Sequence, residues 1–288
     1  MREWVCKRRD TLVCTDARYT THARTDGRKQ DGRTHASARA HPPTHTHTSG
    51  PGKIIGDSHT LFKVSGNKAH LEAEDVEFVH VASATRQERR ELGAAVFVLG
   101  KATATFENCS LTSEEGFGLW LSQKSRVRAQ RCLVTQCGRS AVVMFGHGAL
   151  DLMASNITSP GMNGICARGN TRVTATGCRV EDAPMRGIYA YENATLKLAA
   201  CAVSGTRNAG LAAVQVESLQ TSDSATLVMD STCTFDQNRG VDIHVAGTVR
   251  CSGDVASVYG VRPVSEALGP RCPEPKTWAG EDLAAVCE

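Results

Sequence analysis

Short stretches of alternating apolar and polar residues fill the chain from about residue 60 to residue 255. In the segment from Gly187 to Val203 nearly every second residue is aliphatic, and the residues between are polar or aromatic. Such a period of two is typical of β-strands with one buried face. No part of this region has ten or more residues at helical spacing, and Gly, Asn, Ser and Thr separate the apolar runs. The pattern therefore predicts an all-β region of short strands joined by tight turns.

A repeat organises these strands. Five segments share one pattern of small and aliphatic residues: Gly118–Leu121, Ala141–Met144, Gly164–Ala167, Gly187–Ala190 and Gly210–Ala213. A second recurring position holds Cys109, Cys132, Asn156, Cys178 and Cys201, at spacings of 23, 24, 22 and 23 residues. A fixed period of this length indicates a solenoid. Each unit has room for three short strands and lacks a leucine-rich repeat frame, so we expect a parallel β-helix of about seven coils.

The clearest copies of the unit, residues 164–171 and 187–194, resemble the right-handed parallel β-helix repeats of the pectate-lyase-like superfamily. The resemblance covers about residues 60 to 255. It extends to the β-helix regions of F-box substrate-recognition subunits, of Shc-binding spindle-associated proteins and of alginate epimerases. It implies a right-handed solenoid. Because that superfamily holds lyases, hydrolases, epimerases and non-catalytic binders, it leaves the function open.

The composition divides the chain into three parts. Residues 1–52 carry 10 Lys and Arg against 5 Asp and Glu, with a Thr/His/Arg/Pro-rich sequence that predicts a disordered basic arm. We expect the β-helix over residues 53–262 and a loop and short helix capping it over residues 263–288. The charges beyond the arm nearly balance, at 23 basic and 25 acidic residues, which gives no reason to expect nucleic-acid binding. The first residues lack an apolar signal sequence and no run approaches membrane-spanning length, so the expected location is cytoplasmic or nuclear, with no membrane partner.

The 12 cysteines do not follow the spacing of zinc sites. Cys109, Cys132, Cys178, Cys201 and Cys233 recur at one position of the repeat, so we expect an inward ladder of reduced cysteines that includes Asn156. Neighbouring coils could bring Cys109 and Cys132 within disulfide range. No cofactor and no metal site is expected.

Alternation also predicts which side chains point away from the core. At the first strand of each coil the aliphatic residues should point inward. In the last two coils the residues expected to point inward are Leu211 with Ala213 and Val241 with Ile243. The outward set forms a largely apolar stripe. Its candidate binding residues are Phe97, Trp120, Val143, Arg168, Tyr189 and Tyr191, with Met144 as the alternative to Val143. Either a partner binds this stripe, or the N-terminal arm, residues 216–224 or the turn at 83–92 covers it.

The residues expected on this outward face bear on two candidate functions. An apolar stripe favours a non-catalytic module that binds a protein partner as a scaffold. The alternative is a carbohydrate-active protein that binds an acidic polysaccharide, and any activity would be that of a polysaccharide lyase or uronate epimerase. Such an enzyme needs a base and a group that neutralises the substrate carboxylate. The candidates are scattered: Arg168 with Tyr191, and Asp242 with His244, whereas Glu181, Asp182 and Arg186 read as a solvated charged corner. The sequence therefore leans away from catalysis.

Overall fold

The computed structural model describes residues 2–6, 12–15, 45–48, 52–56, 60–81, 93–220, 222–247 and 249–253. Regular structure in these residues consists of strands, which form three parallel sheets of nine strands each. Successive strands along the chain enter the three sheets in rotation, so each coil of the chain adds one strand to every sheet. This arrangement is a parallel β-helix, as the alternating pattern predicted.

We name the sheets by their order within the repeat. The first sheet contains β2 (Leu12–Thr15), β5 (Thr60–Gly66), β8 (Ala94–Gly100), β11 (Phe117–Leu121), β14 (Val142–Met144), β17 (Ile165–Arg168), β20 (Ile188–Tyr191), β23 (Val214–Glu217) and β26 (Ile243–Ala246). The second sheet contains β3 (His45–Thr48), β6 (His70–Glu74), β9 (Thr103–Glu107), β12 (Arg126–Gln130), β15 (Ala149–Met153), β18 (Arg172–Thr176), β21 (Thr195–Ala199), β24 (Ala225–Met229) and β27 (Val249–Gly253). The third sheet contains β1 (Arg2–Cys6), β4 (Gly52–Gly56), β7 (Val76–His80), β10 (Ser110–Ser113), β13 (Leu133–Cys137), β16 (Asn156–Pro160), β19 (Arg179–Glu181), β22 (Ala202–Ser204) and β25 (Thr234–Asp236).

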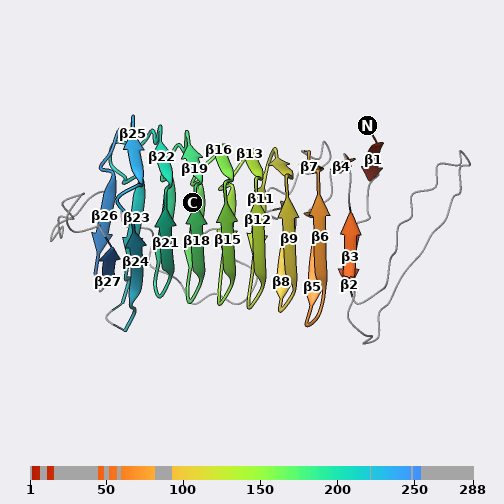
Figure 1. Ribbon diagram of the computed structural model, residues 1–288, viewed down its shortest axis with the longest axis horizontal. Coiled ribbons are helices and arrows are strands. Elements are labelled where there is room, and N and C mark those ends of the chain that lie inside the picture. The colour runs from red at the N-terminus through yellow and green to blue at the C-terminus, as the bar shows by residue number, and fades with distance from the viewer. Residues whose placement is uncertain are drawn as a thin grey trace, which may run out of the picture.

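The coils stack along the long axis of the molecule, with β1 near one end and β26 and β27 at the other (Figure 1). The described residues make nine coils, where the repeat alone predicted about seven. The additional coils lie outside the regular 22–24-residue period. One of them arises because β1, β2 and β3, which fall within residues 1–52, each pair with the next strand of their sheet. Most of the predicted basic arm and the predicted cap at 263–288 lie outside the described residues, so the proposed boundaries stay predictions.

The inner faces of the three sheets form one continuous core. Along β12, for example, Val127 and Ala129 are buried while Arg126 and Arg128 are exposed. Near the N-terminal end the core is aromatic: the Phe78 ring meets those of Phe62 at 6.0 Å and Phe106 at 5.9 Å, both edge-on. Because these rings come from all three sheets, this contact ties the sheets together across the interior.

The recurring glycine of the repeat has a packing reason. A β-carbon at Gly118, Gly164 or Gly187 would overlap a methyl group of a valine 16 residues further on, namely Val134, Val180 or Val203. Each valine lies on the third-sheet strand of the same coil and fills the space beside the start of the first-sheet strand. Gly210 has no such neighbour, since a β-carbon there would meet only the Asn208 side chain at 3.4 Å. The fourth glycine of the pattern therefore does not occupy the same structural position.

The strand register corrects the predicted alignment at two coils near the C-terminus. Ile188 pairs with Val214, and Val214 pairs with Ile243, so the inward strand positions predicted for Leu211 and Ala213 belong to Val214 and Val216. Ala213 is also buried in the core, at the position that Gly187 has one coil earlier. In the last coil the side chains that point toward the core are those of Ile243 and Val245. The irregular segment before β23 displaces the strand from the position that Gly210 indicated.

In the middle of the repeat the register decides one alternative and corrects one prediction. Val143 pairs with Trp120 and Cys166, so Val143 points outward with Phe145, and Met144 belongs to the central core. In the cysteine ladder the residue that stacks between Cys132 and Cys178 is Ser155, because Asn156 pairs with Leu133 and is exposed. The ladder spacing is then 23 residues throughout Cys109, Cys132, Ser155, Cys178 and Cys201.

Candidate functional site

Outward side chains of the first sheet form a second apolar cluster, separate from the central core. We call it the outer cluster; it contains Ala94, Phe117, Val143, Phe145, Cys166, Tyr189 and Tyr191, with Trp120 packed against it. Its members belong to β8, β11, β14, β17 and β20 or lie directly beside them. The predicted stripe is therefore a contiguous feature that runs over five coils.

The burial of the candidate binding residues is uneven. Phe97, Trp120 and Arg168 are half-buried, whereas the exposed fractions are 0% for Val143, 3% for Tyr189 and 2% for Tyr191. This burial favours a covered face at Val143, Tyr189 and Tyr191, whereas the half-buried residues Phe97, Trp120 and Arg168 are the part of the stripe that is open to a partner. Among the predicted covers, residues 216–224 present Leu219 to solvent, and the turn at 83–92 lies outside the described residues.

The N-terminal end of this face is aromatic. The rings of Phe97 and Trp120 lie 4.6 Å apart, and Phe117 meets Trp120 at 5.6 Å. The ammonium group of Lys63, one coil before Phe97, lies 5.8 Å from the Phe97 ring. The indole Nε1 of Trp120 is buried without a hydrogen-bond acceptor among the described residues.

The C-terminal end of the face carries a four-layer stack. Tyr189 and Tyr191, two residues apart on β20, have stacked rings with centroids 4.6 Å apart and an angle of 21° between the ring planes. The guanidinium of Arg186 lies 4.2 Å from the Tyr189 ring, and that of Arg168 lies 5.8 Å from the Tyr191 ring. Arg168 also pairs with Glu192 at 2.7 Å. Cations held over aromatic rings are stabilised by the ring quadrupole, and the contact strengthens when water is excluded.

Arg186 corrects a prediction. The sequence suggested a solvated charged corner, yet Arg186 is 8% exposed and its Nε donates to Oε1 of Gln215 at 2.5 Å. Gln215 in turn donates to Glu217. Buried polar side chains need such partners, because an unpaired one costs the full desolvation energy. The backbone N–H of Arg186 donates to the side chain of buried Asn163 at 3.2 Å, which fixes the turn that carries the guanidinium.

Sequence reasoning missed Gln215 and Glu217. The available signal was the alternation Val214-Gln215-Val216-Glu217, which is a clearer strand pattern than the segment after Gly210. The two acceptors then occupy the outward column beside Tyr189 and Tyr191, with which they pair.

The other predicted pair, Asp242 and His244, is not brought together on this face. Asp242 precedes β26, is exposed, and accepts a hydrogen bond from Asn238 at 3.1 Å. His244 alone lies in the outward column, paired with Gln215. In the part of the chain that the structure describes, no three His, Cys, Asp or Glu side chains gather as a metal site.

All three cation–π contacts among the described residues lie on the outer face of the first sheet. From β5 to β20 they span five inter-strand steps, about 24 Å at the parallel-strand spacing. Fixed guanidinium groups recognise carboxylates by paired hydrogen bonds, and aromatic rings present flat apolar surfaces. This combination suits an extended anionic ligand.

Comparison with known proteins agrees with this architecture. Residues 147–261 match the family model of the right-handed β-helix region. The fold is a right-handed parallel β-helix. Among solved structures, the chain is similar to a mutant of the periplasmic alginate epimerase AlgG, with a TM-score of 0.51 and 12% sequence identity. The match covers 74% of this chain and 52% of the epimerase, so this β-helix spans about half the length of that protein.

At 12% identity this likeness shows the fold alone. Comparison with curated protein sequences finds no match. No helix long and apolar enough to cross a membrane occurs in the described ranges. The predicted cytoplasmic or nuclear location stays a prediction.

Proposed function

We propose that the chain binds an acidic polysaccharide along the outer face of the first sheet. The observation that carries this proposal is the placement of three cations, those of Lys63, Arg168 and Arg186, over aromatic rings of one face. Each ring restrains the cation beside it, which lowers the entropy lost when a carboxylate binds. The fold that this chain shares with an alginate epimerase supports the same ligand class.

Arg168 is the expected entry point for the ligand. Its side chain is 17% exposed and already pairs with a carboxylate, that of Glu192, so a carboxylate fits the geometry at this position. A uronate that displaces Glu192 would exchange one charge-assisted hydrogen bond for another. Arg186 lies at the other end of the tyrosine stack and extends the site toward Gln215.

The test is calorimetric titration of the full chain with polygalacturonate and alginate, beside neutral dextran. We expect binding of the polyuronates, weakened at least tenfold by Arg168→Gln. Arg172→Gln is the matched control, because Arg172 follows four residues later on β18, is exposed on the second sheet, and loses the same charge. Equal losses in the two variants, or no polyuronate binding by the parent chain, would reject the proposal. Assay of the same mixtures for unsaturated or epimerised products shows whether binding leads to turnover.

A second candidate function is recognition of a protein partner through the N-terminal end of the same face. Half-buried Phe97 and Trp120 stack there, and aromatic residues of this kind commonly anchor interfaces. The buried Nε1 of Trp120, which lacks an acceptor among the described residues, supports this candidate. Affinity capture with the parent chain and with Trp120→Ala tests it: a partner retained by Arg168→Gln but lost by Trp120→Ala would favour the scaffold function.

A further inference from the structure

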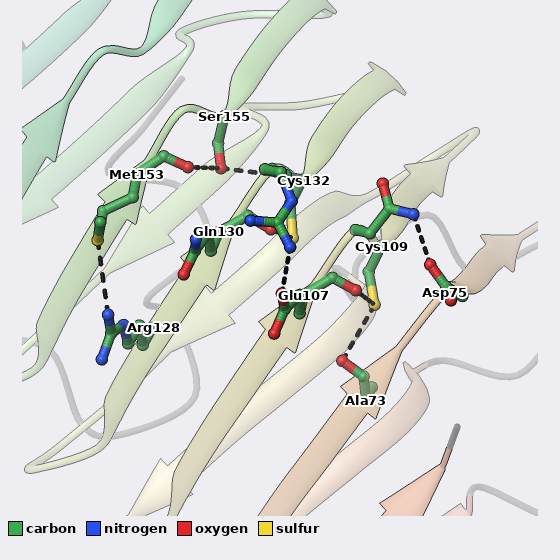
Figure 2. A network of polar contacts seen from close by, with 11 residues as sticks. Ala73, Asp75, Glu107, Cys109, Arg128, Gln130, Cys132, Met153 and Ser155 are labelled. Atoms are coloured by element: carbon green, nitrogen blue, oxygen red, sulfur yellow. Dashed lines mark hydrogen bonds and ion pairs between the residues drawn. The ribbon is translucent and has the colours of Figure 1, made fainter. Parts of the chain in front are cut away.

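Five cysteines occupy equivalent positions at the turn between the second and third sheets: Cys109, Cys132, Cys178, Cys201 and Cys233. The backbone carbonyls of Cys109, Cys132 and Cys178 each accept a hydrogen bond from the N–H of the residue that follows the next ladder position: Leu133 at 2.9 Å, Asn156 at 2.8 Å and Ala202 at 2.8 Å. Each ladder residue therefore stacks directly on the next. Figure 2 shows Cys109, Cys132 and Ser155 on successive coils.

Ser155 divides this ladder into one pair of thiols and one run of three. It occupies the place of a cysteine: its hydroxyl donates to the carbonyl of Met153 at 2.8 Å, as the Cys132 thiol donates to Gln130 at 3.3 Å. Cys109 and Cys132 stack on one side of Ser155, and Cys178, Cys201 and Cys233 stack on the other. Cys178 and Cys201 are separated by one regular repeat of 23 residues, whereas Cys233 follows Cys201 by 32 residues. The thiols of Cys109, Cys132, Cys178 and Cys201 are free, and these residues are 2–3% exposed.

The spacing of the coils brings these thiols near bonding distance. Equivalent Cα atoms of neighbouring parallel strands lie about 4.8 Å apart, within the range of about 4.4 to 6.8 Å found across disulfides. The Cβ atoms must approach each other by about 1 Å to reach their usual separation in a disulfide. A bond formed here is therefore slightly strained and easily reduced.

We infer that two of the stacked pairs, Cys109 with Cys132 and Cys178 with Cys201, are modification sites that close reversible disulfides between coils. The oxidant is a small-molecule disulfide such as glutathione disulfide. The thiolate of one cysteine attacks it, forms a mixed disulfide and releases one glutathione thiolate. The second cysteine then attacks the protein sulfur of that mixed disulfide and releases the second glutathione. Two protein thiols are oxidised, one glutathione disulfide is reduced, and the thiol protons pass to the two glutathione thiolates.

Each pair has an asymmetry that favours this chemistry. Hydrogen bonding with Cys201 lowers the pKa of the Cys178 thiol to about 7, and hydrogen bonding with Cys109 lowers the pKa of Cys132. The same contacts raise the pKa of Cys201 and of Cys109. One member of each pair is therefore the better nucleophile near neutral pH, and its stacked neighbour resolves the mixed disulfide.

The disulfides would join sequential coils and leave the fold intact. Each closes a loop of about one repeat, so it restricts the opening of one coil from the next, which is how solenoids unravel. The inference is independent of the polysaccharide proposal, since the ladder lies on a different part of the coil from the first-sheet outer face.

The test is incubation of the full chain with glutathione disulfide at pH 8, followed by non-reducing peptide mapping and thiol titration. We expect cross-linked peptides joining Cys109 to Cys132 and Cys178 to Cys201, with a loss of two thiols per pair that dithiothreitol reverses. The variants Cys132→Ser and Cys201→Ser should each abolish one cross-link and leave the other. Both substitutions should fold, because Ser155 shows that serine fits the ladder.

Two further variants sharpen the result. Cys137→Ser removes a buried thiol outside the ladder. Residue 137 aligns with Ser113 and Pro160 on the neighbouring strands and has no stacked cysteine, so both cross-links should persist. Ser155→Cys should add a new cross-link to Cys132 or Cys178, because stacking alone decides the partner. Only mixed glutathione adducts, or cross-links between non-stacked cysteines, would overturn the inference. The inference would also be overturned if the thiols of the parent chain stayed unchanged and the Ser155→Cys variant formed no cross-link either.

Discussion

The guanidinium of Arg186 lies 4.2 Å from the ring of Tyr189 and donates through Nε to Gln215 at 2.5 Å. The two contacts hold a charged group at 8% exposure on the outside of the β-helix core. Burying a charge is costly unless it is hydrogen-bonded. The stability of this end of the molecule should therefore depend on the partners of Arg186 and not only on apolar packing.

Gln215→Ala should lower the free energy of unfolding by about 1.5–3 kcal/mol, because it removes a hydrogen bond to a buried charge. Urea unfolding measures the loss. The control Gln220→Ala removes an exposed amide and should change the stability by no more than about 0.5 kcal/mol. Similar losses in both variants would mean that Gln215 does not support Arg186.

Gly164→Ala should be far more damaging than Gly210→Ala, although both glycines belong to the same sequence pattern. The new methyl group at residue 164 would overlap Val180 and the backbone carbonyl of Gly187, and the backbone cannot move independently. We expect a loss of about 3 kcal/mol, at the upper end for overpacking. At residue 210 the nearest atom is 3.4 Å away, so the change should stay within about 1 kcal/mol. Thermal unfolding of the two variants measures the difference, and equal shifts would contradict the packing explanation.

The repeat predicted the fold because its two signals come from the same physics. Alternation reports which side chains enter the core, and the fixed period reports how the coils stack, so strand type, sheet number and the inward direction of Leu119, Ile165 and Ile188 were accessible from the sequence. The alignment failed where the period changed. An irregular segment of the chain lies between Ser204 and Val214, and a sequence pattern cannot say how many residues such a segment absorbs.

The candidate site was predictable only in part. Alternation placed Phe97, Trp120 and Tyr189 on the outer face, as the strand pairing shows. It could not predict burial there, since exposure depends on what lies over a sheet and not on the strand itself. Arg186 was read as solvated because it sits in a turn rich in charged residues, and only the tertiary position of Gln215 reveals its partner.

Inner and outer aromatic residues should differ sharply in their effect on stability. Phe78→Ala removes a ring that is 0% exposed and contacts Phe62 and Phe106, so we expect a loss of about 3–5 kcal/mol. Phe97→Ala removes a half-buried ring from the outer face, where about 1 kcal/mol is expected from its smaller buried area. The measurement is urea unfolding, in which the dependence of the unfolding free energy on urea concentration should be the same for both variants and the parent chain. A loss at Phe97 as large as that at Phe78 would show that the outer face is part of the cooperative core.

The last prediction concerns alkaline pH and the thiol of Cys137. Burial raises the pKa of this thiol from 9.0 to about 12, because a thiolate would lose its hydration at this buried position, the last residue of β13. Between these values the folded chain keeps a proton that the unfolded chain releases. The contribution of Cys137 is thus fully present below pH 9 and is lost as the pH rises toward 12. The loss is about 1.4 kcal/mol per pH unit.

Cys137→Ala removes this titration and should make the decline of stability between pH 9 and pH 11 shallower by about that amount per unit. The comparison is between slopes, since the variant also loses packing at every pH. Val134→Ala is the control, because Val134 is buried on the same strand and carries no titratable group. It should lower the stability by a constant offset and leave the slope of the parent chain. Urea unfolding at half-unit pH steps supplies all three slopes. Parallel curves for Cys137→Ala and the parent chain would show that this thiol does not titrate in the unfolding transition.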